Sequence, residues 1–231
     1  MALNVVSEAR RCLNCKKPMC MEGCPISTEI PKMIQMFLNG EMEEAGEMLF
    51  DNNPLSVVCS LVCSHEKQCQ GHCVLGRKGN PVHISSIENY ISTTYLDRLK
   101  FEKPESNGKM VGIVGSGPAG ITIAIELARR GYDVTIFESK DKIGGVLRYG
   151  IPEFRLPKDI VQKEISNLKE MGVDIETNVV IGKTLTVDEL FDEMNFDAVY
   201  IGSGAGLPHF MGIEGESLNG VYSANEILTR I

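Results

Sequence analysis

The stretch that decides the fold of this chain is MVGIVGSGPAG, residues 110–120. Its first five residues predict a buried strand, and the run from Pro118 to Arg130 predicts a helix. Residues Asp133 to Phe137 predict the strand that follows. Gly131 lies just after the helix, where a left-handed cap is usual. A strand, a helix and a strand in this order predict a parallel βαβ unit.

The turn between this first strand and the helix carries three glycines spaced as Gly-x-Gly-x-x-Gly. In a dinucleotide-binding turn the first glycine allows the tight turn, the second lets a pyrophosphate approach the backbone, and the third lets helix and strand pack closely. The free amides at the start of the helix then face the phosphates. We therefore expect a dinucleotide at this turn. The expected binding residues are Gly115, Ser116, Gly117, Pro118, Ala119 and Gly120.

Glu138 ends the second strand, 18 residues after the last glycine, where a carboxylate accepts hydrogen bonds from ribose hydroxyls. A 2′-phosphate about 4 Å away would be repelled by roughly 1 kcal/mol per charge pair in water, and by about 4 kcal/mol at an effective dielectric constant of 20. NADP is therefore disfavoured, whereas FAD and NAD both fit. The paired glycines Gly144 and Gly145 resemble the flavoprotein version of the fingerprint and favour FAD. Glycines that only turn a loop are the alternative.

A linker is predicted at residues 101–109, FEKPESNGK, where charges, a proline and an Asn-Gly pair interrupt both hydrophobic periodicities. We predict a helical domain in residues 1–105 and an α/β domain in residues 106–231. Helices are predicted at Glu29–Asn39, Glu41–Phe50, Ile84–Leu99, Lys158–Met171 and Val187–Met194. Further strands are predicted at Val173–Glu176, Val179–Ile181 and Ala198–Ile201.

All eight cysteines lie within the first 73 residues. Disulfides suit small secreted domains and fit this longer chain poorly. Zinc sites usually present two Cys-x2-Cys pairs, and this chain has one, although His65 and His72 lie close by. The bacterial ferredoxin run, in which the last cysteine ligates a second cluster, accounts for more of the pattern. The spacing is Cys12-x2-Cys15-x4-Cys20-x3-Cys24-Pro25, then Cys59-x3-Cys63-x5-Cys69-x3-Cys73.

Two iron–sulfur clusters are therefore the first hypothesis. By the crossing of ligands in that run, the first three cysteines would share a cluster with a distant cysteine, most naturally Cys73, and Cys24 would reach the second cluster. On a helix Cys69 and Cys73 would lie one turn apart on one face, so one short element could serve both clusters. The second hypothesis is a zinc-stabilised interaction module without redox chemistry.

The composition excludes several other classes. The chain has 23 Lys and Arg against 31 Asp and Glu, a net charge of −8, which argues against a nucleic-acid partner. No apolar run reaches the roughly 18 to 20 residues that a membrane span requires. Residues 1–11 lack the apolar core of a signal peptide, so we expect a cytoplasmic location.

The cysteine array, the glycine turn, Glu138, the pair Gly144-Gly145 and the run YGIPEFRLPK at residues 149–158 together resemble the small (beta) subunit of NADPH-dependent glutamate synthase. They are also similar to the N-terminal part of dihydropyrimidine dehydrogenase and to the large subunit of NADH-dependent ferredoxin:NADP oxidoreductase. The resemblance extends over essentially the whole chain. It implies an oxidoreductase with a helical domain holding two 4Fe–4S clusters, followed by a Rossmann-like FAD domain, which passes electrons between NAD(P)H and a partner subunit.

The resemblance also implies the cluster ligands. In that family the second cluster takes a carboxylate or amide as its fourth ligand, on the helix after Pro-Val-x-Ile, and Glu88 occupies this position. Counting cysteines alone would choose Cys59 over Glu88; we follow the resemblance. The implied ligands are Cys12, Cys15, Cys20 and Cys73 for one cluster, and Cys24, Cys63, Cys69 and Glu88 for the other.

For the flavin, the resemblance places Arg155 at the flavin side of the site and Val180 beside the adenine. In relatives a complete NAD(P)H domain follows, and the chain then returns to finish the FAD domain, whereas this sequence stops at Ile231. We therefore expect an incomplete FAD domain that binds FAD weakly or not at all alone, with a second chain or segment supplying the NAD(P)H domain. The other expected FAD-binding residues are Glu138, Ser139, Gly144, Gly145 and Val146.

Overall fold

The computed structural model describes residues 4–101 and 104–230 and divides the chain into two compact units, residues 1–100 and 101–231. The division falls after Lys100, five residues before the predicted boundary. Parts of three predictions lie outside the described residues. These parts are Met1, Ala2 and Leu3 of the opening segment, Glu102 and Lys103 of the linker, and Ile231.

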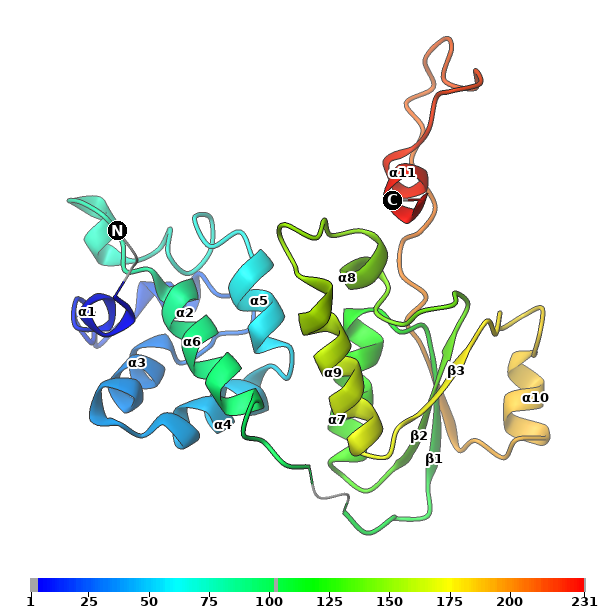
Figure 1. The fold of residues 1–231 in the computed structure, drawn as a ribbon, viewed down its shortest axis with the longest axis horizontal. Helices are drawn as coiled ribbons and strands as arrows, with labels where there is room; N and C mark the ends of the chain where they lie inside the picture. The colour runs from blue at the N-terminus through cyan, green and yellow to red at the C-terminus, as the bar shows by residue number, and fades with distance from the viewer. Residues whose placement is uncertain (1–3, 102–103, 231) are drawn as a thin grey trace. The chain divides into compact units, whose positions relative to one another are not determined.

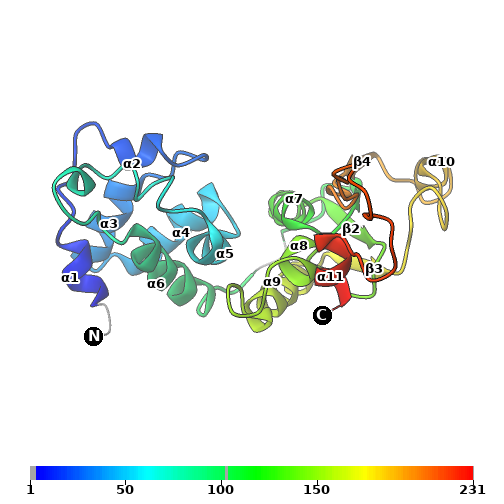
Figure 2. The same ribbon diagram turned by 90° about the horizontal axis from the view of Figure 1, so that it is seen from above.

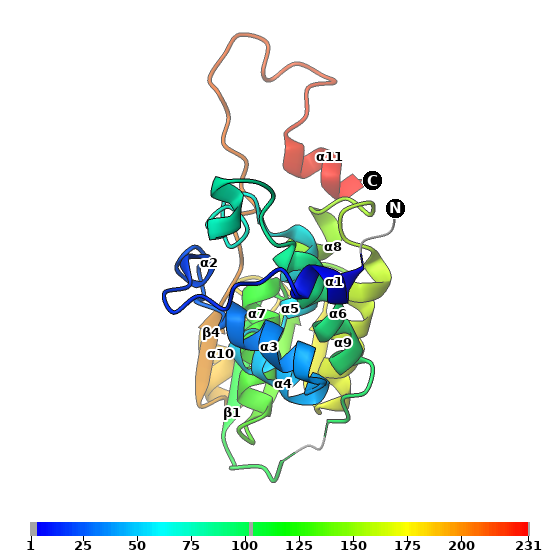
Figure 3. The same ribbon diagram turned by 90° about the vertical axis from the view of Figure 1, so that its left-hand side faces the viewer.

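The first unit is helical, and its longest helix, α6, lies at its centre (Figures 1 and 3). Helix α6 packs against α1, α3, α4 and α5. The side chains of Met33, Ile34, Ile87 and Ile91 are fully buried in the core. The elements are α1 (Val5–Ala9), α2 (Met19–Glu22), α3 (Ile30–Asn39), α4 (Met42–Asn52), α5 (Ser56–Val62), the 3₁₀ helix η1 (Val74–Arg77) and α6 (Ile84–Leu96).

Local sequence explains where these helices begin and end. Asn4 caps α1, because its side chain accepts a hydrogen bond from the Ser7 amide at 2.9 Å. Helix α3 carries Pro31 in its first turn and ends at Gly40, whose φ of +86° suits glycine. The three predicted helices of this unit correspond to α3, α4 and α6, with ends shifted by up to three residues.

A helix that carries both Cys69 and Cys73, as considered from the sequence, is not formed. Residues 65–72 make a series of turns instead, in which the Gly71 amide donates to the His65 carbonyl at 3.0 Å. A Cβ atom on Gly71 would lie 2.2 Å from the Glu66 carbonyl oxygen, so only glycine fits at this turn. The two cysteines therefore come from a compact loop.

The second unit contains a parallel sheet with the strand order β3-β2-β1-β4. Helix α7 (Pro118–Ala128) connects β1 to β2 as predicted, and Gly131 after it has a φ of +80°. Helices α7 and α9 (Lys158–Glu170) cover one face of the sheet, and α10 (Val187–Asp192) lies on the other (Figures 1 and 2). The strands are β1 (Met110–Val114), β2 (Asp133–Glu138), β3 (Asp174–Thr177) and β4 (Ala198–Ile201).

Apolar side chains hold α10 against its face of the sheet. Phe137 of β2 packs with Leu190 of α10 and with Phe196, and the two phenyl rings meet edge to face with centroids 5.7 Å apart. The strand predicted at Val179–Ile181 is wrong. The Val180 carbonyl accepts the amides of Lys183 and Thr184, so the chain turns there and leaves only an isolated bridge.

Two short helices complete the second unit: α8 (Val146–Tyr149) after the paired glycines, and α11 (Ala224–Arg230). Residues 202–223, between β4 and α11, form no regular element, and Leu207, Phe210 and Met211 are exposed. Within the described ranges, no helix is both long and apolar enough to cross a membrane.

Candidate cofactor sites

The first candidate site is a pocket in the helical unit lined by four of the predicted ligands. Cys12 and Cys15 lie in the loop after α1, Cys20 lies on α2, and Cys73 immediately precedes η1. Apolar side chains, including Val82 just before α6, complete the lining. Positions up to 61 residues apart in the sequence are thus brought to one pocket.

The thiols of this pocket influence one another electrostatically. Burial is the main cause that raises the pKa of Cys12 and of Cys20, the latter to about 11. Cys15 and Cys73 raise the pKa of Cys12 further, and Cys73 and Cys12 do the same for Cys20. The sulfur atoms therefore lie near enough that a cationic metal group would stabilise all four as thiolates.

The other predicted ligands form a second group beside the first. Burial raises the pKa of Cys69 to about 12, and the nearby Glu88, Cys24 and Cys20 add to the rise. The hydroxyl of Thr28 lies 3.4 Å from the Cys24 sulfur. Glu88 is half-buried on α6, and desolvation followed by the proximity of Cys59 raises its pKa to about 8. Cys69 thus lies close to members of both groups.

Cys59 also belongs to this second group in space. Its sulfur is hydrogen-bonded to Cys63, and this bond lowers the pKa of Cys59 to about 6 while it raises the pKa of Cys63. Glu88 and Cys69 raise the pKa of Cys63 as well. All eight cysteines are free thiols. The geometry therefore brings both Cys59 and Glu88 to the second site.

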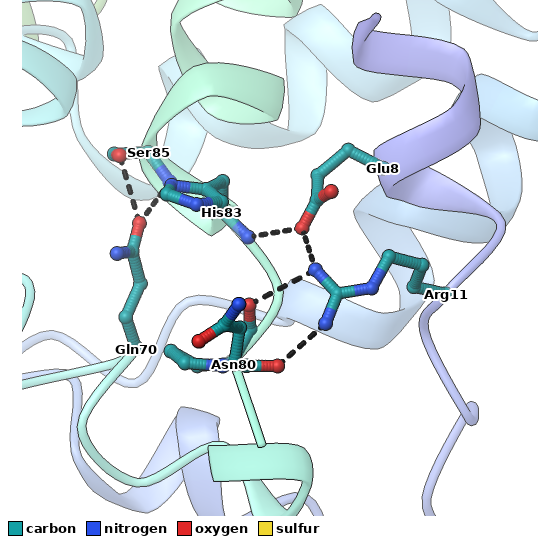
Figure 4. Close-up of polar contacts among 7 residues, drawn as sticks. Glu8, Arg11, Gln70, Asn80, His83 and Ser85 are labelled. Carbon is teal, nitrogen blue, oxygen red and sulfur yellow. Dashed lines mark hydrogen bonds and ion pairs between the residues drawn. The ribbon is translucent and has the colours of Figure 1, made fainter. Parts of the chain in front are cut away.

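Polar contacts that the sequence did not predict hold the walls of these sites in place (Figure 4). The side-chain oxygen of Gln70, between Cys69 and Cys73, accepts hydrogen bonds from the Ser85 amide at 3.0 Å and the Ser85 hydroxyl at 2.8 Å. This capping matters because His83, the N-cap residue of α6, makes no side-chain cap of its own. Gln70 therefore ties the cysteine loop to the start of the helix that carries Glu88.

The nucleotide-binding turn has the geometry that the glycine spacing predicts. Gly115 has a φ of +99°, and a Cβ atom there would lie 2.4 Å from the Gly202 carbonyl oxygen at the end of β4. A Cβ atom on Gly120 would lie 2.0 Å from the Gly115 carbonyl oxygen. Gly117, at the start of α7, has nothing within 4 Å of its Cβ position. The turn is thus tightly packed on one side and open where a phosphate would approach.

Glu138 lies directly beside this turn, but protein groups occupy its carboxylate. One oxygen accepts from the Ser116 amide at 3.1 Å and from the Ser116 hydroxyl, and the other accepts from the Lys140 amide at 2.9 Å and the Ser139 hydroxyl at 3.1 Å. Burial raises the pKa of Glu138, but these bonds outweigh it and hold the pKa below its ordinary value. To bind Glu138, a ribose hydroxyl would have to replace one of these protein donors. The Ser116 hydroxyl is the donor whose position it would take.

The paired glycines lie against the same turn. The Gly144 amide donates to the Ser116 carbonyl at 3.1 Å and hydroxyl at 3.0 Å. A Cβ atom on Gly145, whose φ is +50°, would lie 2.7 Å from the Gly117 Cα atom. A larger residue would therefore push the two loops apart. Sequence reasoning found these glycines but not the Ser116 hydroxyl that connects them to Glu138.

The remaining predicted FAD-binding residues lie on the surface of the second unit. Val146 begins α8 and is 54% exposed, Val180 is 38% exposed, and Ser139 and Arg155 are also exposed. Lys158, which was not assigned a role, donates to the Leu147 carbonyl at 2.9 Å and to the Ile151 carbonyl. It fixes the segment between Val146 and Arg155.

Two family models match this chain. The model for dihydropyrimidine dehydrogenase domain II, 4Fe-4S cluster, matches residues 2–99, and the model for an NAD(P)-binding Rossmann-like domain matches residues 113–162. The fold and these matches define an iron–sulfur domain followed by a Rossmann-like nucleotide-binding domain, as the sequence predicted.

Curated relatives match nearly the whole chain. The NAD-dependent dihydropyrimidine dehydrogenase subunit PreT of Escherichia coli O157:H7 is 38% identical over 90% of this chain and 52% of its own length. The glutamate synthase (NADPH) small chain of Halomonas elongata is 36% identical over 97% of this chain and 48% of its own. The chain is similar to these oxidoreductase subunits along nearly its whole length, and it spans about half the length of the curated relatives it matches.

Among solved structures, FprA from Mycobacterium tuberculosis in complex with NADPH matches 52% of this chain and 28% of its own, with a TM-score of 0.47 and 25% identity. A likeness of this size does not bear on function.

Proposed function

We propose that this chain is the iron–sulfur and flavin-binding part of an NAD(P)H-dependent oxidoreductase that passes electrons through two 4Fe–4S clusters to a partner subunit. The observation that carries the proposal is the pocket lined by Cys12, Cys15, Cys20 and Cys73. It lies within residues 2–99, which match an iron–sulfur family. Four thiols that line one pocket are the donor set that a cubane cluster requires.

The arrangement of donors favours a cluster over one zinc ion. Zinc draws its sulfur ligands to about 2.3 Å. Between residues 4 and 101 and between 104 and 230, no three His, Cys, Asp or Glu side chains converge in a way that would hold a single metal ion. The four ligands of a cubane bind four different iron atoms and therefore stand farther apart.

For the second cluster we assign Cys24, Cys63, Cys69 and Glu88 as ligands. The support is that Glu88 raises the pKa of both Cys63 and Cys69, which requires the carboxyl to lie near both sulfurs. Helix α6, held by Gln70, would keep the carboxylate at this position. Cys59 would stay a protein thiol that donates to or accepts from its neighbour Cys63.

For the nucleotide we assign FAD. The amides of residues 117–120 would hold its pyrophosphate, and Glu138 would accept the ribose hydroxyls once the Ser116 hydroxyl turns aside. Gly145, whose backbone lies against Gly117, supports the flavoprotein form of the turn. The side chains of Arg155 and Val180, both exposed in this unit, would line the flavin and adenine ends.

A bound flavin supplies the conversion between two-electron hydride transfer and the one-electron steps that iron–sulfur clusters carry out. The residues of this chain hold and orient the groups: thiolates and a carboxylate retain the clusters, and contacts such as Thr28 to Cys24 tune them. Names such as small chain and subunit describe the relatives as parts of assemblies. A larger redox subunit is the partner we propose here, and further protein would supply the NAD(P)H site.

Anaerobic purification followed by metal, sulfide and flavin assays tests the proposal. We expect about eight iron atoms and about eight acid-labile sulfides per chain, as two cubanes require. Zinc in place of iron and sulfide would show a zinc-stabilised module instead. One tightly bound FAD in the chain alone would contradict only the expectation that this chain binds FAD weakly.

The ligand assignment has its own test. Glu88→Ala should change the electron paramagnetic resonance signal of one reduced cluster and lower its iron content, because a ligand is removed. Cys59→Ala should leave both signals intact. Loss of a cluster with Cys59→Ala and retention with Glu88→Ala would show that cysteines alone bind the metal.

A further inference from the structure

Positive charge is concentrated on the two segments that wall the first cysteine pocket. Residues 9–21 and 70–87 carry six Lys and Arg and no Asp or Glu, whereas the rest of residues 1–100 carries four Lys and Arg and eleven Asp and Glu. Both segments contribute side chains to the pocket lining. Since the whole chain has a net charge of −8, this patch reverses the sign of the surrounding protein.

Arg11 holds the two segments side by side (Figure 4). Its guanidinium donates to the Asn80 carbonyl at 2.5 Å and to the Pro81 carbonyl at 3.2 Å. Glu8 is buried, pairs with Arg11, and accepts the His83 amide at 2.8 Å. The charges before Cys20 and after Cys73 therefore belong to one continuous surface around the pocket.

We call the five exposed cations of this surface the basic collar. Within residues 4–101, none of the five forms an ion pair, and Glu8, the buried carboxylate next to the first segment, pairs with Arg11. Leu13, which lines the pocket and is 61% exposed, lies in the same loop as two of them. Protein interfaces usually have an apolar centre surrounded by polar and charged residues. The basic collar consists of Arg10, Lys16, Lys17, Arg77 and Lys78.

We propose that the basic collar is a docking surface for an acidic electron-carrier protein that accepts electrons from the first cluster site. The inference rests on the proposed function. In the transfer, one electron leaves the reduced cluster and enters the carrier, so the cluster is oxidised by one electron and the carrier is reduced by one. No bond forms or breaks. Complementary charge would raise the rate of encounter and orient the carrier toward the pocket.

The position and composition of the collar favour a protein carrier over a nucleic acid. The cations lie on the two segments that line a pocket with four thiols, which is where an electron would leave the domain. The two segments contain no Phe, Tyr or Trp, the side chains on which unpaired bases stack.

The test uses the full chain with its clusters reduced by dithionite and then mixed with oxidised flavodoxin, an acidic carrier. The double variants Lys16→Glu/Lys17→Glu and Arg77→Glu/Lys78→Glu should each slow the second-order electron transfer at least tenfold at low salt. Addition of about 0.5 M salt should remove most of the difference from wild type, because exposed charges are then screened. Lys32→Glu/Lys100→Glu makes the same charge change outside the collar and should slow transfer less than twofold.

Several outcomes would overturn the proposal. Equal slowing by the collar and control variants would show that only net charge matters. Loss of the first cluster's spectroscopic signal in the neutral variant Lys16→Gln/Lys17→Gln would show that the cations balance the charge of the cluster. Collar-dependent binding of duplex DNA that is tighter than that of flavodoxin would indicate a nucleic-acid site. If the chain contains no cluster, the proposed function fails, and salt-dependent binding of flavodoxin, measured by calorimetry, still tests the collar.

Discussion

The helical unit and the sheet unit build their candidate sites by different means. In the helical unit, side chains form the site: Cys69 is part of the apolar core, and Cys12, Cys20, Cys24 and Cys73 pack against it. In the sheet unit, backbone forms the site, because Gly115 and Gly120 bring strand, turn and helix into contact closer than a Cβ atom permits. The core of that unit lies below the turn, between the sheet and its helices.

This difference predicts which site depends on its ligand. The thiols of the helical unit are costly to leave buried and ionised without a metal, and they adjoin the residues that hold the unit together. The glycine turn has its shape without any ligand, because the hydrogen bonds of β1 and the packing of Gly120 fix it. Metal loss should therefore unfold one unit, whereas nucleotide loss should leave the other folded.

The largest expected effect is that of iron removal. Structural metal binding can supply on the order of 10 kcal/mol of folding free energy, so oxidation and chelation of the clusters should unfold residues 4–100 and leave the sheet intact. Hydrogen exchange followed by mass spectrometry measures both units in one sample. Amides of α6 should lose protection, and amides of β1 and β2 should keep theirs. Equal loss of amide protection in both units would show that the sheet unit also depends on the metal.

A substitution of one glycine should destabilise the sheet unit next most strongly. Gly120→Ala places a Cβ atom 2.0 Å from the Gly115 carbonyl oxygen, and the resulting shift of helix against strand should cost about 3 kcal/mol. Urea unfolding followed by the exchange of β1 amides measures this change. The helical unit should keep its iron.

Gly117→Ala is the matched control, because the space around its Cβ position is open. Its stability should stay within about 0.5 kcal/mol of wild type. Affinity for ADP, measured by calorimetry, should nevertheless fall roughly tenfold, which corresponds to about 1.4 kcal/mol, since the methyl group occupies the phosphate approach. Loss of stability in Gly117→Ala, or none in Gly120→Ala, would show that the glycines do not have these separate roles.

The third prediction concerns the side-chain contacts of the helical unit. Gln70→Leu removes the acceptor for the Ser85 amide and hydroxyl, and loss of such a cap should cost about 1 to 2 kcal/mol. Gln70→Glu keeps an oxygen acceptor and adds a negative charge that the helix N-terminus favours. Guanidinium unfolding of the cluster-containing chain should therefore place wild type and Gln70→Glu above Gln70→Leu in stability. Equal loss in both variants would show that Gln70 acts by packing.

The regular elements with strong local patterns could be predicted from the sequence. Strand β1 has the predicted bounds, Met110–Val114, because an apolar run followed by a glycine turn has few alternatives. Helix α5, Ser56–Val62, was missed because SVVCSLV is short, apolar and rich in β-branched residues and so resembles a buried strand. The predicted strand at Val179–Ile181 failed for the converse reason, since Gly182 and Thr184 turn the chain after only three apolar residues.

The candidate sites were predictable where backbone geometry sets them and unpredictable where distant side chains do. Glycine spacing alone indicated the roles of Gly115, Gly117 and Gly120. The contact of Arg11 with Asn80 joins residues 69 positions apart, and the contact of Ser116 with Glu138 joins residues 22 apart. No local pattern encodes such contacts. The cysteines are brought together as expected, and their identity as ligands stays a prediction.

The smallest expected effect is a pH dependence that belongs to the sheet unit alone. The folded state holds the pKa of Glu138 below its ordinary value of 4.5, because the bonds from Ser116, Lys140 and Ser139 outweigh burial. Such a group stabilises the fold above pH 4.5, and this contribution is lost as the pH falls below 4.5 through the folded pKa. Ser116→Ala removes one of the four donors, so it should lower stability by less than about 1 kcal/mol at pH 7. The difference in stability from wild type should shrink as the pH falls toward 3.5. The Ser116 hydroxyl stabilises the ionised carboxylate, so its removal costs less once Glu138 is protonated.

The exchange of β1 and β2 amides at pH 7, 5 and 3.5 measures this difference without interference from the acid-labile clusters. Ser223→Ala serves as the control, since its hydroxyl bonds to the exposed Glu226 far from the sheet core, and it should leave β1 exchange unchanged. The same Ser116→Ala variant should bind ADP-ribose at least as tightly as wild type at pH 7, because the ribose no longer competes with a protein hydroxyl for the Glu138 carboxylate. Weaker binding would show that Ser116 positions the carboxylate rather than occupying the place of the ribose.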